Sequence, residues 1–451
     1  MDNSNQLERE NIGKLLWKFS VPAIIGMLVN AMYSIIDRIF VGRAVGLLGI
    51  SATTVAFPII LVTMAFGMLI GIGAAATISI RLGQHKREEA EHILGNALIL
   101  VIIVSVLVTA LGLIFEEPLL VMFGASKEVL PLAKQFIRII LIGTLLQNIG
   151  FGLNNIIRSE GNPKTAMATM LIGAILNIIL NPLFIFGLKL GIQGSALATI
   201  ISQAVCSIWV LAYFMGRKSM LKFKIPNLKL DFHIISQIFS IGMSPFLMQI
   251  VASGITIVFN NALQTYGGDT AIAAMGIITS VTMLIFMPIF GINQGAQPII
   301  GYNYGAKNYE RVKKALKLSI LAATCVCTLG FIIIQLIPRA IIGVFSNNDI
   351  QLLDIGAKGI RIFLIMLPII GFQLVSANFF QAIGRAKIAI FLTLLRQVIV
   401  LLPLLLILPS FLKLTGVWVA GPTADLLSSV MTAVFILRET KKLDKNHLVS
   451  D

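Results

Sequence analysis

Four polar side chains lie at a similar depth within apolar segments of the first half of the chain. Asp37 lies near the end of the first long apolar run. Asn177 and Asn181 are four residues apart, on one face of an expected helix, and Thr199 lies about two turns into the next run. An ionised acid inside a membrane is costly, so such residues are usually functional. A carboxylate surrounded by amide and hydroxyl groups suits binding of a proton or of a small cation such as sodium.

Each of these residues also has an ordinary structural interpretation. Asp37 could be an interfacial acid neutralised by the adjacent Arg38, although neighbours on a helix point about 100° apart. A single Asn or Thr in a span usually serves as a hydrogen bond between helices. The shared depth of the whole set favours the alternative, a cation-coupling site made of Asp37, Asn177, Asn181 and Thr199.

A second deep acid, Asp425, lies in the last apolar run, and Arg396 lies in the run before it. The two runs are expected to form a hairpin in which these residues differ in depth by roughly 4–5 Å, at about 1.5 Å per residue. Opposite charges inside a membrane usually pair. We therefore predict a structural ion pair here, with a second ion site at Asp425 as the open alternative.

Further amides and methionines are candidates for lining a substrate cavity, because some of the amides in spans must line water and methionine adapts to varied ligands. The candidates are Asn30, Gln147, Asn154, Met248, Asn260, Met283 and Met287. Two prolines within apolar runs, Pro22 and Pro182, are candidate hinges, since internal proline removes a helix hydrogen bond.

These residues require membrane helices to position them. The chain has 451 residues, of which 57% are hydrophobic and 12% charged, about half the charged fraction of a soluble domain. We identify twelve apolar runs, each long enough to span a bilayer. They cover approximately residues 15–41, 51–80, 92–115, 131–157, 165–187, 192–215, 235–262, 272–300, 316–337, 359–383, 388–409 and 415–437.

The net charge of +15 does not indicate nucleic acid, because the basic residues lie in short segments between apolar runs. Most of the 35 Lys and Arg residues fall on the side that carries the N-terminus and every second connection. The positive-inside rule places both termini in the cytoplasm. We expect a monomeric, multi-pass protein of the bacterial inner membrane, in contact with the lipid bilayer.

The two halves of the chain repeat one another at an offset of 222 or 223 residues. Aligned pairs include Pro22 with Pro245, Asp37 with Asn260, Gly73 with Gly295, Gly83 with Gly305 and Asn155 with Asn378. Six spans per half make these parallel repeats about an axis along the membrane normal. The predicted fold is therefore an all-α polytopic membrane protein with twelve transmembrane helices in two six-helix lobes related by pseudo-two-fold symmetry. The expected divisions are an N-lobe (1–216), a cytoplasmic linker (217–234), a C-lobe (235–437) and a cytoplasmic tail (438–451).

Motifs of enzymes are missing from the sequence. The four histidines lie in connections or at span ends, the three cysteines have no metal spacing, and no phosphate-binding Gly-Lys-Ser/Thr loop is present. We expect no enzymatic activity, no cofactor, and no metal other than sodium at the coupling site.

Several motifs resemble the MATE family of multidrug and toxic compound extrusion transporters, part of the MOP superfamily, over essentially the whole chain. They are Asp37 followed by Arg-Ile-Phe-Val-Gly, the run Asn-Pro-Leu-Phe-Ile-Phe-Gly at 181–187, Gly-Ile-Gly-Ala-Ala-Ala-Thr at 71–77, and Gly-Ile-Asn-Gln-Gly-Ala-Gln-Pro at 291–298. The chain is most similar to the DinF-like and MepA-like bacterial branches.

The resemblance implies an antiporter that exports lipophilic cationic drugs or toxins by alternating access, driven by protons or sodium. It also implies a cation site at the positions of Asp37, Asn177, Asn181 and Thr199. The position of Asn181 is often Asp in the family, so a relay between two acids is not expected here. Ser253 stands where another branch carries Glu, which disfavours a second cation site. A lipid-linked oligosaccharide flippase of the same superfamily is the alternative function.

Overall fold

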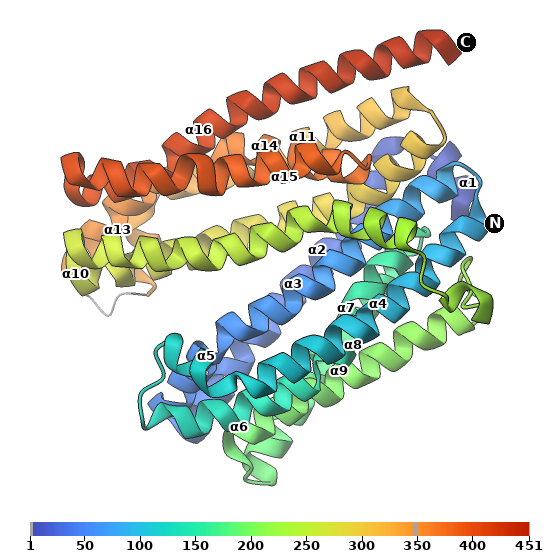
Figure 1. Cartoon of the computed structure of the whole chain (residues 1–451). Helices are drawn as coiled ribbons and strands as arrows, with labels where there is room; N and C mark the ends of the chain where they lie inside the picture. Colours follow the sequence, from blue (N-terminus) through green and yellow to red (C-terminus); the bar gives the residue numbers. More distant parts are fainter. Residues whose placement is uncertain (1–2, 346–349, 451) are drawn as a thin grey trace.

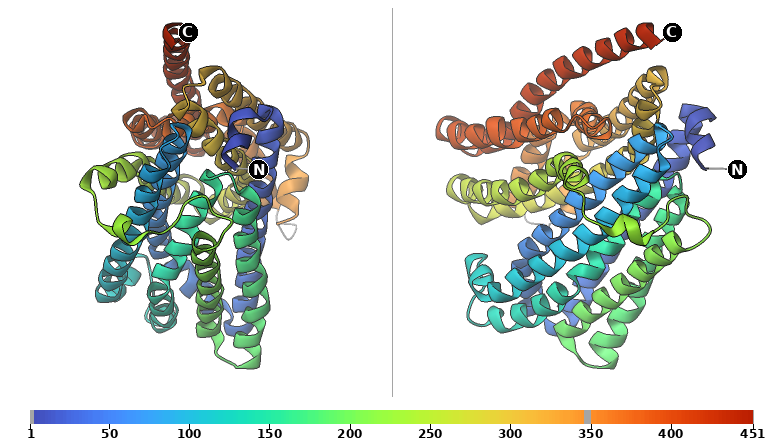
Figure 2. Two further views of the ribbon diagram at one scale, coloured as in Figure 1. Left: turned by 90° about the vertical axis from the view of Figure 1, so that its right-hand side faces the viewer. Right: turned by 45° about the vertical axis from the view of Figure 1, so that its right-hand side comes forward.

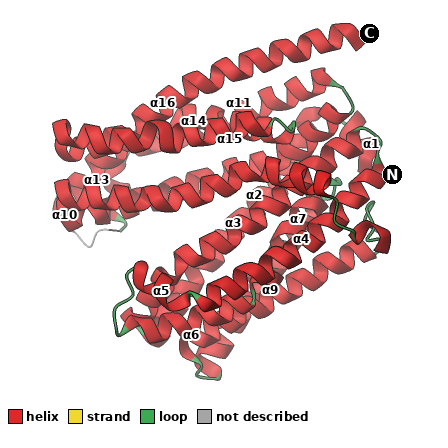
Figure 3. Cartoon of the chain, viewed as in Figure 1, coloured by secondary structure: helices red, strands yellow, loops and turns green. Residues whose placement is uncertain are grey.

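The computed structural model describes residues 3–345 and 350–450, and the regular structure in these residues is helical (Figure 3). Residue 451, the end of the expected tail, lies outside them. In the described part, eight helices are long and apolar enough to cross a membrane, or ten if each of two bent pairs is one span. Two of the long helices, α10 (Phe232–Gly305) and α16 (Leu402–Ser450), contain a break, at Gly268 (φ 65°) and Lys413 (φ 52°). Divided at these breaks, they complete the twelve predicted spans.

The other elements follow one another in chain order. The first half contains α1 (Asn3–Arg9), α2 (Ile12–Val45), α3 (Leu47–Gly83), α4 (Arg87–Ile114), α5 (Glu116–Met122), α6 (Val129–Ile142), α7 (Thr144–Ser159), α8 (Pro163–Pro182), the π-helical η1 (Leu183–Gly187) and α9 (Gly191–Met215). The second half contains, besides α10 and α16, α11 (Tyr309–Leu336), α12 (Pro338–Gly343), α13 (Ile350–Phe363), α14 (Leu367–Ala382), α15 (Ala386–Leu394) and the π-helical η3 (Leu395–Leu401). The short 3₁₀ helix η2 (Ile225–Leu228) lies between the halves.

The two halves share their irregularities as well as their helices. The fourth span of each half is bent, by 51° between α6 and α7 and by 50° between α13 and α14. A π-helical segment follows Pro182 in the fifth span and precedes Pro403 in the eleventh, as expected where proline removes a backbone donor. The arrangement is the predicted pair of six-helix lobes.

The lobes lie side by side, and both chain termini are at one end of the bundle (Figures 1 and 2). We call this end the termini end. The lobes meet there and spread apart toward the opposite end, where α5 and α6 lie far from α10 and α13 (Figure 1). The molecule is therefore closed between its lobes at the termini end.

Glycines make the closed end possible, because the backbones of α3 and α10 touch there. A Cβ atom at Gly83 would overlap the carbonyl oxygen of Tyr302, and a Cβ atom at Gly305 would overlap that of Ile80. Ile80 and Tyr302 are themselves partners in the repeat, so the two contacts are related by the pseudo-two-fold axis. A Cβ atom at Gly242 would likewise overlap the carbonyl oxygen of Leu69. Only residues without a side chain allow so close an approach.

The connection between the lobes is bound to the N-lobe along its length. Asn96 of α4 donates to the Lys229 carbonyl at 3.1 Å and accepts from the Asp231 amide at 2.8 Å. Glu91 of α4, which is 3% exposed, pairs with Lys224 at 2.5 Å. α10 then begins at Phe232, three residues before the predicted run, because Asp231 caps it by accepting from the His233 amide.

Glu160, between α7 and α8, holds the beginning of the same connection. Its Oε2 accepts hydrogen bonds from Ser219 Oγ at 3.0 Å and from the amides of Met220 and Leu221 at 3.1 Å each. Glu160 is 1% exposed. Burial raises the pKa of this carboxyl group from 4.5 to about 7, although the hydrogen bonds from Tyr213, Leu221, Ser219 and Met220 oppose the shift.

We expect the stability of this contact to depend on pH. Because the folded-state pKa exceeds the unfolded value, the folded protein holds an extra proton between about pH 4.5 and 7, and the free energy of unfolding falls as the pH rises through that window. Glu160→Gln should reduce the decrease in melting temperature between pH 5 and pH 8, measured on purified protein in detergent. The matched control is Glu88→Gln, which replaces an exposed acid and should leave the decrease in melting temperature as in the wild type. An unaltered decrease in Glu160→Gln would contradict a raised pKa at Glu160.

Candidate functional site

Asp37 lies near the end of α2 that is distant from the termini, where α2 packs against α8 and α9. Its Oδ1 accepts a hydrogen bond from Asn181 Nδ2 at 2.5 Å and another from Ser195 Oγ at 2.7 Å. One carboxylate oxygen therefore joins three helices. Since both partners donate, the arrangement suits the ionised form of the carboxyl group.

The amides continue the network away from the carboxylate. Asn181 Nδ2 also donates to Asn177 Oδ1 at 3.1 Å, and Asn177 Nδ2 donates to Thr199 Oγ1 at 3.1 Å. Asn177 is 2% and Asn181 0% exposed. The structure thus brings together the four residues proposed from sequence, Asp37, Asn177, Asn181 and Thr199, in one hydrogen-bonded chain.

Helix geometry explains how the network is positioned. Asn177 and Asn181 are one turn apart on α8, and Ser195 and Thr199 are one turn apart on α9. Asn181 precedes Pro182, where α8 gives way to the π-helical η1 before the chain turns into α9. The amide pair of α8 and the hydroxyl pair of α9 therefore face each other, and one member of each pair bonds to Asp37 of α2.

Ser195 is the member of the site that the sequence analysis missed. It is 0% exposed and bonds directly to the carboxylate, whereas Thr199 is linked to it through two amides. A serine near the start of a helix that is rich in glycine and alanine is usually interpreted as a small residue that allows close helix packing. Its spacing from Thr199, one helical turn, was the signal that could have identified it.

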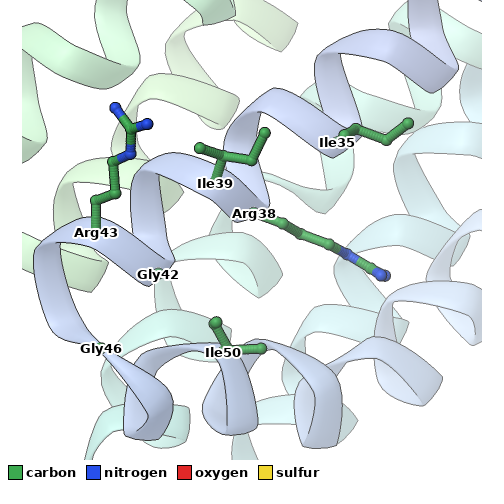
Figure 4. A pocket seen from close by; sticks show the side chains of 7 residues that line it. All are labelled: Ile35, Arg38, Ile39, Gly42, Arg43, Gly46 and Ile50. Carbon is green, nitrogen blue, oxygen red and sulfur yellow. The ribbon is translucent and has the colours of Figure 1, made fainter. Parts of the chain in front are cut away.

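Arg38 is directed to a different surface from Asp37. Its guanidinium carbon lies 5.7 Å from the centre of the Phe57 ring on α3, a cation–π contact. It also lines a cavity of about 540 Å³ together with the other residues labelled in Figure 4: Ile35, Ile39, Gly42, Arg43, Gly46 and Ile50. The structure therefore gives Arg38 a partner other than Asp37.

The seven predicted cavity residues occupy varied environments. Gln147 and Asn154 are buried in α7, and Asn154 Nδ2 donates to the Ala166 carbonyl of α8 at 3.1 Å, a contact within the N-lobe. Asn260 and Met283 are exposed on α10. The remaining three are half-buried: Asn30, Met248 and Met287. Their role in substrate binding stays a prediction.

The predicted hinge prolines lie in different backbone settings. Pro22 is buried inside α2, which continues without interruption from Ile12 to Val45. Pro182 ends α8 at the start of the π-helical segment. A π-helical segment is a common feature of functional sites, and here it adjoins Asn181. Bending at either proline stays a prediction.

Arg396 and Asp425 lie in contact in the C-lobe. Arg396 Nε donates to Asp425 Oδ1 at 2.6 Å. The side chains are 22% and 5% exposed respectively. Arg396 belongs to the π-helical η3, and Asp425 belongs to the part of α16 after the break at Lys413.

Removing one member of this pair should destabilise the C-lobe. Asp425→Asn leaves the Arg396 guanidinium without its counter-ion, a change that costs about 3–5 kcal/mol for a buried pair. We expect a lower melting temperature for the purified variant, and partial recovery in the double variant Arg396→Met with Asp425→Asn. The exposed pair Arg339 and Asp354 is the matched control, and Asp354→Asn should have little effect. A melting temperature of Asp425→Asn equal to that of the wild type would contradict a structural role.

Comparison with known proteins identifies related chains over the full length. The model of the family described as MatE matches residues 22–183 and 245–407, one match in each lobe. The multidrug export protein MepA of Staphylococcus haemolyticus (strain JCSC1435) is 29% identical over 445 residues, covering 98% of this chain and 97% of the relative. The MepA protein of Staphylococcus aureus (strain MRSA252) is 28% identical over 444 residues, covering 98% of each.

Solved structures of similar chains have the same architecture. The MATE multidrug transporter DinF-BH superposes with a TM-score of 0.88 at 39% identity, covering 94% of this chain and 95% of that one. An outward-facing MATE transporter of the MOP superfamily gives a TM-score of 0.91 at 26% identity, covering 97% and 98%. Because the family model matches most of both lobes, the chain belongs to the MatE family of membrane transporters and is not an enzyme.

Proposed function

We propose that this protein is a cation-coupled multidrug antiporter that exports lipophilic cationic compounds. The observation that supports the proposal is the carboxylate of Asp37, held by Asn181 and Ser195 through one of its two oxygens. A group of this kind, placed inside a membrane span, can exchange its charge with a proton or a sodium ion during a transport cycle. The names of the MepA and DinF-BH relatives support the drug-export part of the proposal.

The orientation follows from the charge distribution. We place the termini end in the cytoplasm of a bacterial cell, since most Lys and Arg residues lie in connections on that side. The lobes are then closed toward the cytoplasm and spread apart toward the outside. Uptake of the ion by Asp37 from outside would remove the charge that holds α2 to α8 and α9, and so favour release of the drug. The protein acts as a monomer, with six helices in each lobe.

The buried oxygen of Asn181 supports direct binding of the coupling ion. Asn181 Oδ1 is buried and has no hydrogen-bond donor among the described residues. An acceptor in this position needs a proton donor or a cation. Asn181 Oδ1, Thr199 Oγ1 and the Asp37 carboxylate are oxygen ligands that would suit sodium, and the carboxylate alone would serve a proton.

The flippase alternative finds less support in the site. A flippase for a pyrophosphate lipid would need free cations in its cavity. The deep cation Arg396 is instead paired with Asp425.

Dye efflux from proteoliposomes tests the proposal directly. Purified protein is reconstituted, loaded with a fluorescent lipophilic cation, and given either an imposed pH gradient or an imposed sodium gradient. We expect one gradient to drive efflux and the other to have no effect. Efflux that is equally fast with neither gradient would show that the protein is not ion-coupled.

A further inference from the structure

Ser195 has a position within the site that differs from those of the other polar residues. It lies in the second turn of α9, is 0% exposed, and its Oγ is 2.7 Å from Asp37 Oδ1. The same carboxylate oxygen accepts from Asn181 Nδ2. The hydroxyl group is thus one of two donors that share the negative charge of the coupling acid.

The two donors have different freedom to leave the carboxylate. Asn181 Nδ2 is held by two acceptors, because it also donates to Asn177 Oδ1 at 3.1 Å. The hydroxyl of Ser195 has one rotatable proton, which can turn toward another acceptor without moving the side chain. Ser195 can therefore give up its bond when the charge of Asp37 is neutralised.

We propose that the Ser195 hydroxyl sets the ion concentration at which transport is coupled, by competing with the ion for the charge of Asp37. This inference rests on the proposed coupling function. A hydrogen bond to an ionised carboxylate is stronger than one to a neutral group. The Ser195 donor therefore stabilises the ion-free form of the site more than the ion-bound form, and Ser195 is a positioning residue that lowers the affinity of the site for its ion.

Removal of the hydroxyl group should consequently increase the affinity for the ion. In Ser195→Ala we expect the ion concentration for half-maximal efflux to fall about fivefold, which corresponds to the difference in strength between a hydrogen bond to an ionised carboxylate and one to a neutralised carboxyl group. Ser195→Cys retains the shape with a weaker donor and should give a smaller shift in the same direction. The dye concentration for half-maximal efflux should stay as in the wild type, because Ser195 bonds to the coupling acid.

The matched control is Ser202→Ala. Ser202 is two turns further along α9, is 3% exposed, and its hydroxyl donates to the Ala198 carbonyl of its own helix at 2.8 Å. It tests whether loss of any buried hydroxyl from α9 changes coupling. We expect wild-type values for both the ion and the dye.

The experiment measures dye efflux from proteoliposomes at varied concentrations of the ion that drives the wild type, with Ser195→Ala, Ser195→Cys, Ser202→Ala and Asp37→Asn in parallel. A fall in the half-maximal ion concentration limited to the two Ser195 variants would support the inference. An unchanged ion concentration in Ser195→Ala, or equal changes for ion and dye, would overturn it. Loss of ion-driven efflux in Asp37→Asn would show that Asp37 is the coupling group even if the Ser195 inference fails. Ion-driven efflux that persists in Asp37→Asn would show that coupling uses a different group, which would overturn the Ser195 inference as well.

Discussion

Replacement of Asp37 by Asn is expected to abolish drug efflux while leaving the protein folded. The Asn side chain retains an oxygen that can accept from Asn181 and Ser195, the donors that hold Asp37. It carries no charge, so it can neither take up a proton nor neutralise a sodium ion. Drug resistance of a sensitised host should fall to the level of cells without the transporter, and gradient-driven dye efflux should fall at least tenfold.

An acid outside the network provides the control for this prediction. Asp269 is an exposed carboxylate next to the break in α10, and Asp269→Asn should transport as the wild type does. Expression and elution volume of both variants should match the wild type. Retained efflux in Asp37→Asn would mean that coupling uses a different group.

Alanine at Gly83 or Gly242 is expected to prevent closure at the termini end and to reduce efflux about tenfold or more. In each case the added methyl group would overlap a backbone carbonyl of the other lobe, that of Tyr302 or Leu69. A backbone atom cannot move aside as a flexible side chain can. The state in which the lobes meet at the termini end would be destabilised relative to states in which they are separated there.

Spin labels on the two lobes can report the change of state. We suggest Lys127→Cys and Asp269→Cys, in a chain with Cys206, Cys325 and Cys327 replaced by Ser. The distance between the two labels, which lie at the end opposite the termini end, should decrease in Gly83→Ala and Gly242→Ala. Gly254→Ala is the control on α10, since a Cβ atom there has no neighbour within 4 Å. Wild-type distances and efflux in all three variants would show that the glycine contacts are dispensable.

Most of the fold could be predicted from the sequence because the bilayer constrains it strongly. Twelve apolar runs and an offset of 222 or 223 residues between the halves were sufficient for the lobes and their symmetry. The helix ends were less predictable. The described part of α13 already includes Ile350, nine residues before the predicted run, and hydropathy missed these residues because Asp354 and Lys358 make this part of the helix polar. Helical hydrogen bonding continues past the apolar region, which hydropathy cannot detect.

The candidate site was predictable in part, for a physical reason. Depth within a span can be estimated by counting residues, so the acid, the two amides and Thr199 could be grouped. Depth does not tell which face of a helix a small residue occupies, and Ser195 was therefore missed. The bends of the fourth and tenth spans depend on packing between helices that are distant in sequence. Hydropathy carries no information about such contacts.

The attachment of the inter-lobe connection to α4 has a consequence for the geometry of transport. Asn96 holds the chain as far as Asp231, and α10 starts at the next residue. The connection between the lobes therefore leaves almost no free chain between its attachment to α4 and the start of α10. The C-lobe can rotate about this attachment at Asp231, but the attachment keeps the start of α10 next to α4. The proposed alternating access would then be a rocking motion with a fixed point near Asp231, in which a small rotation moves the helix ends opposite the termini end the most.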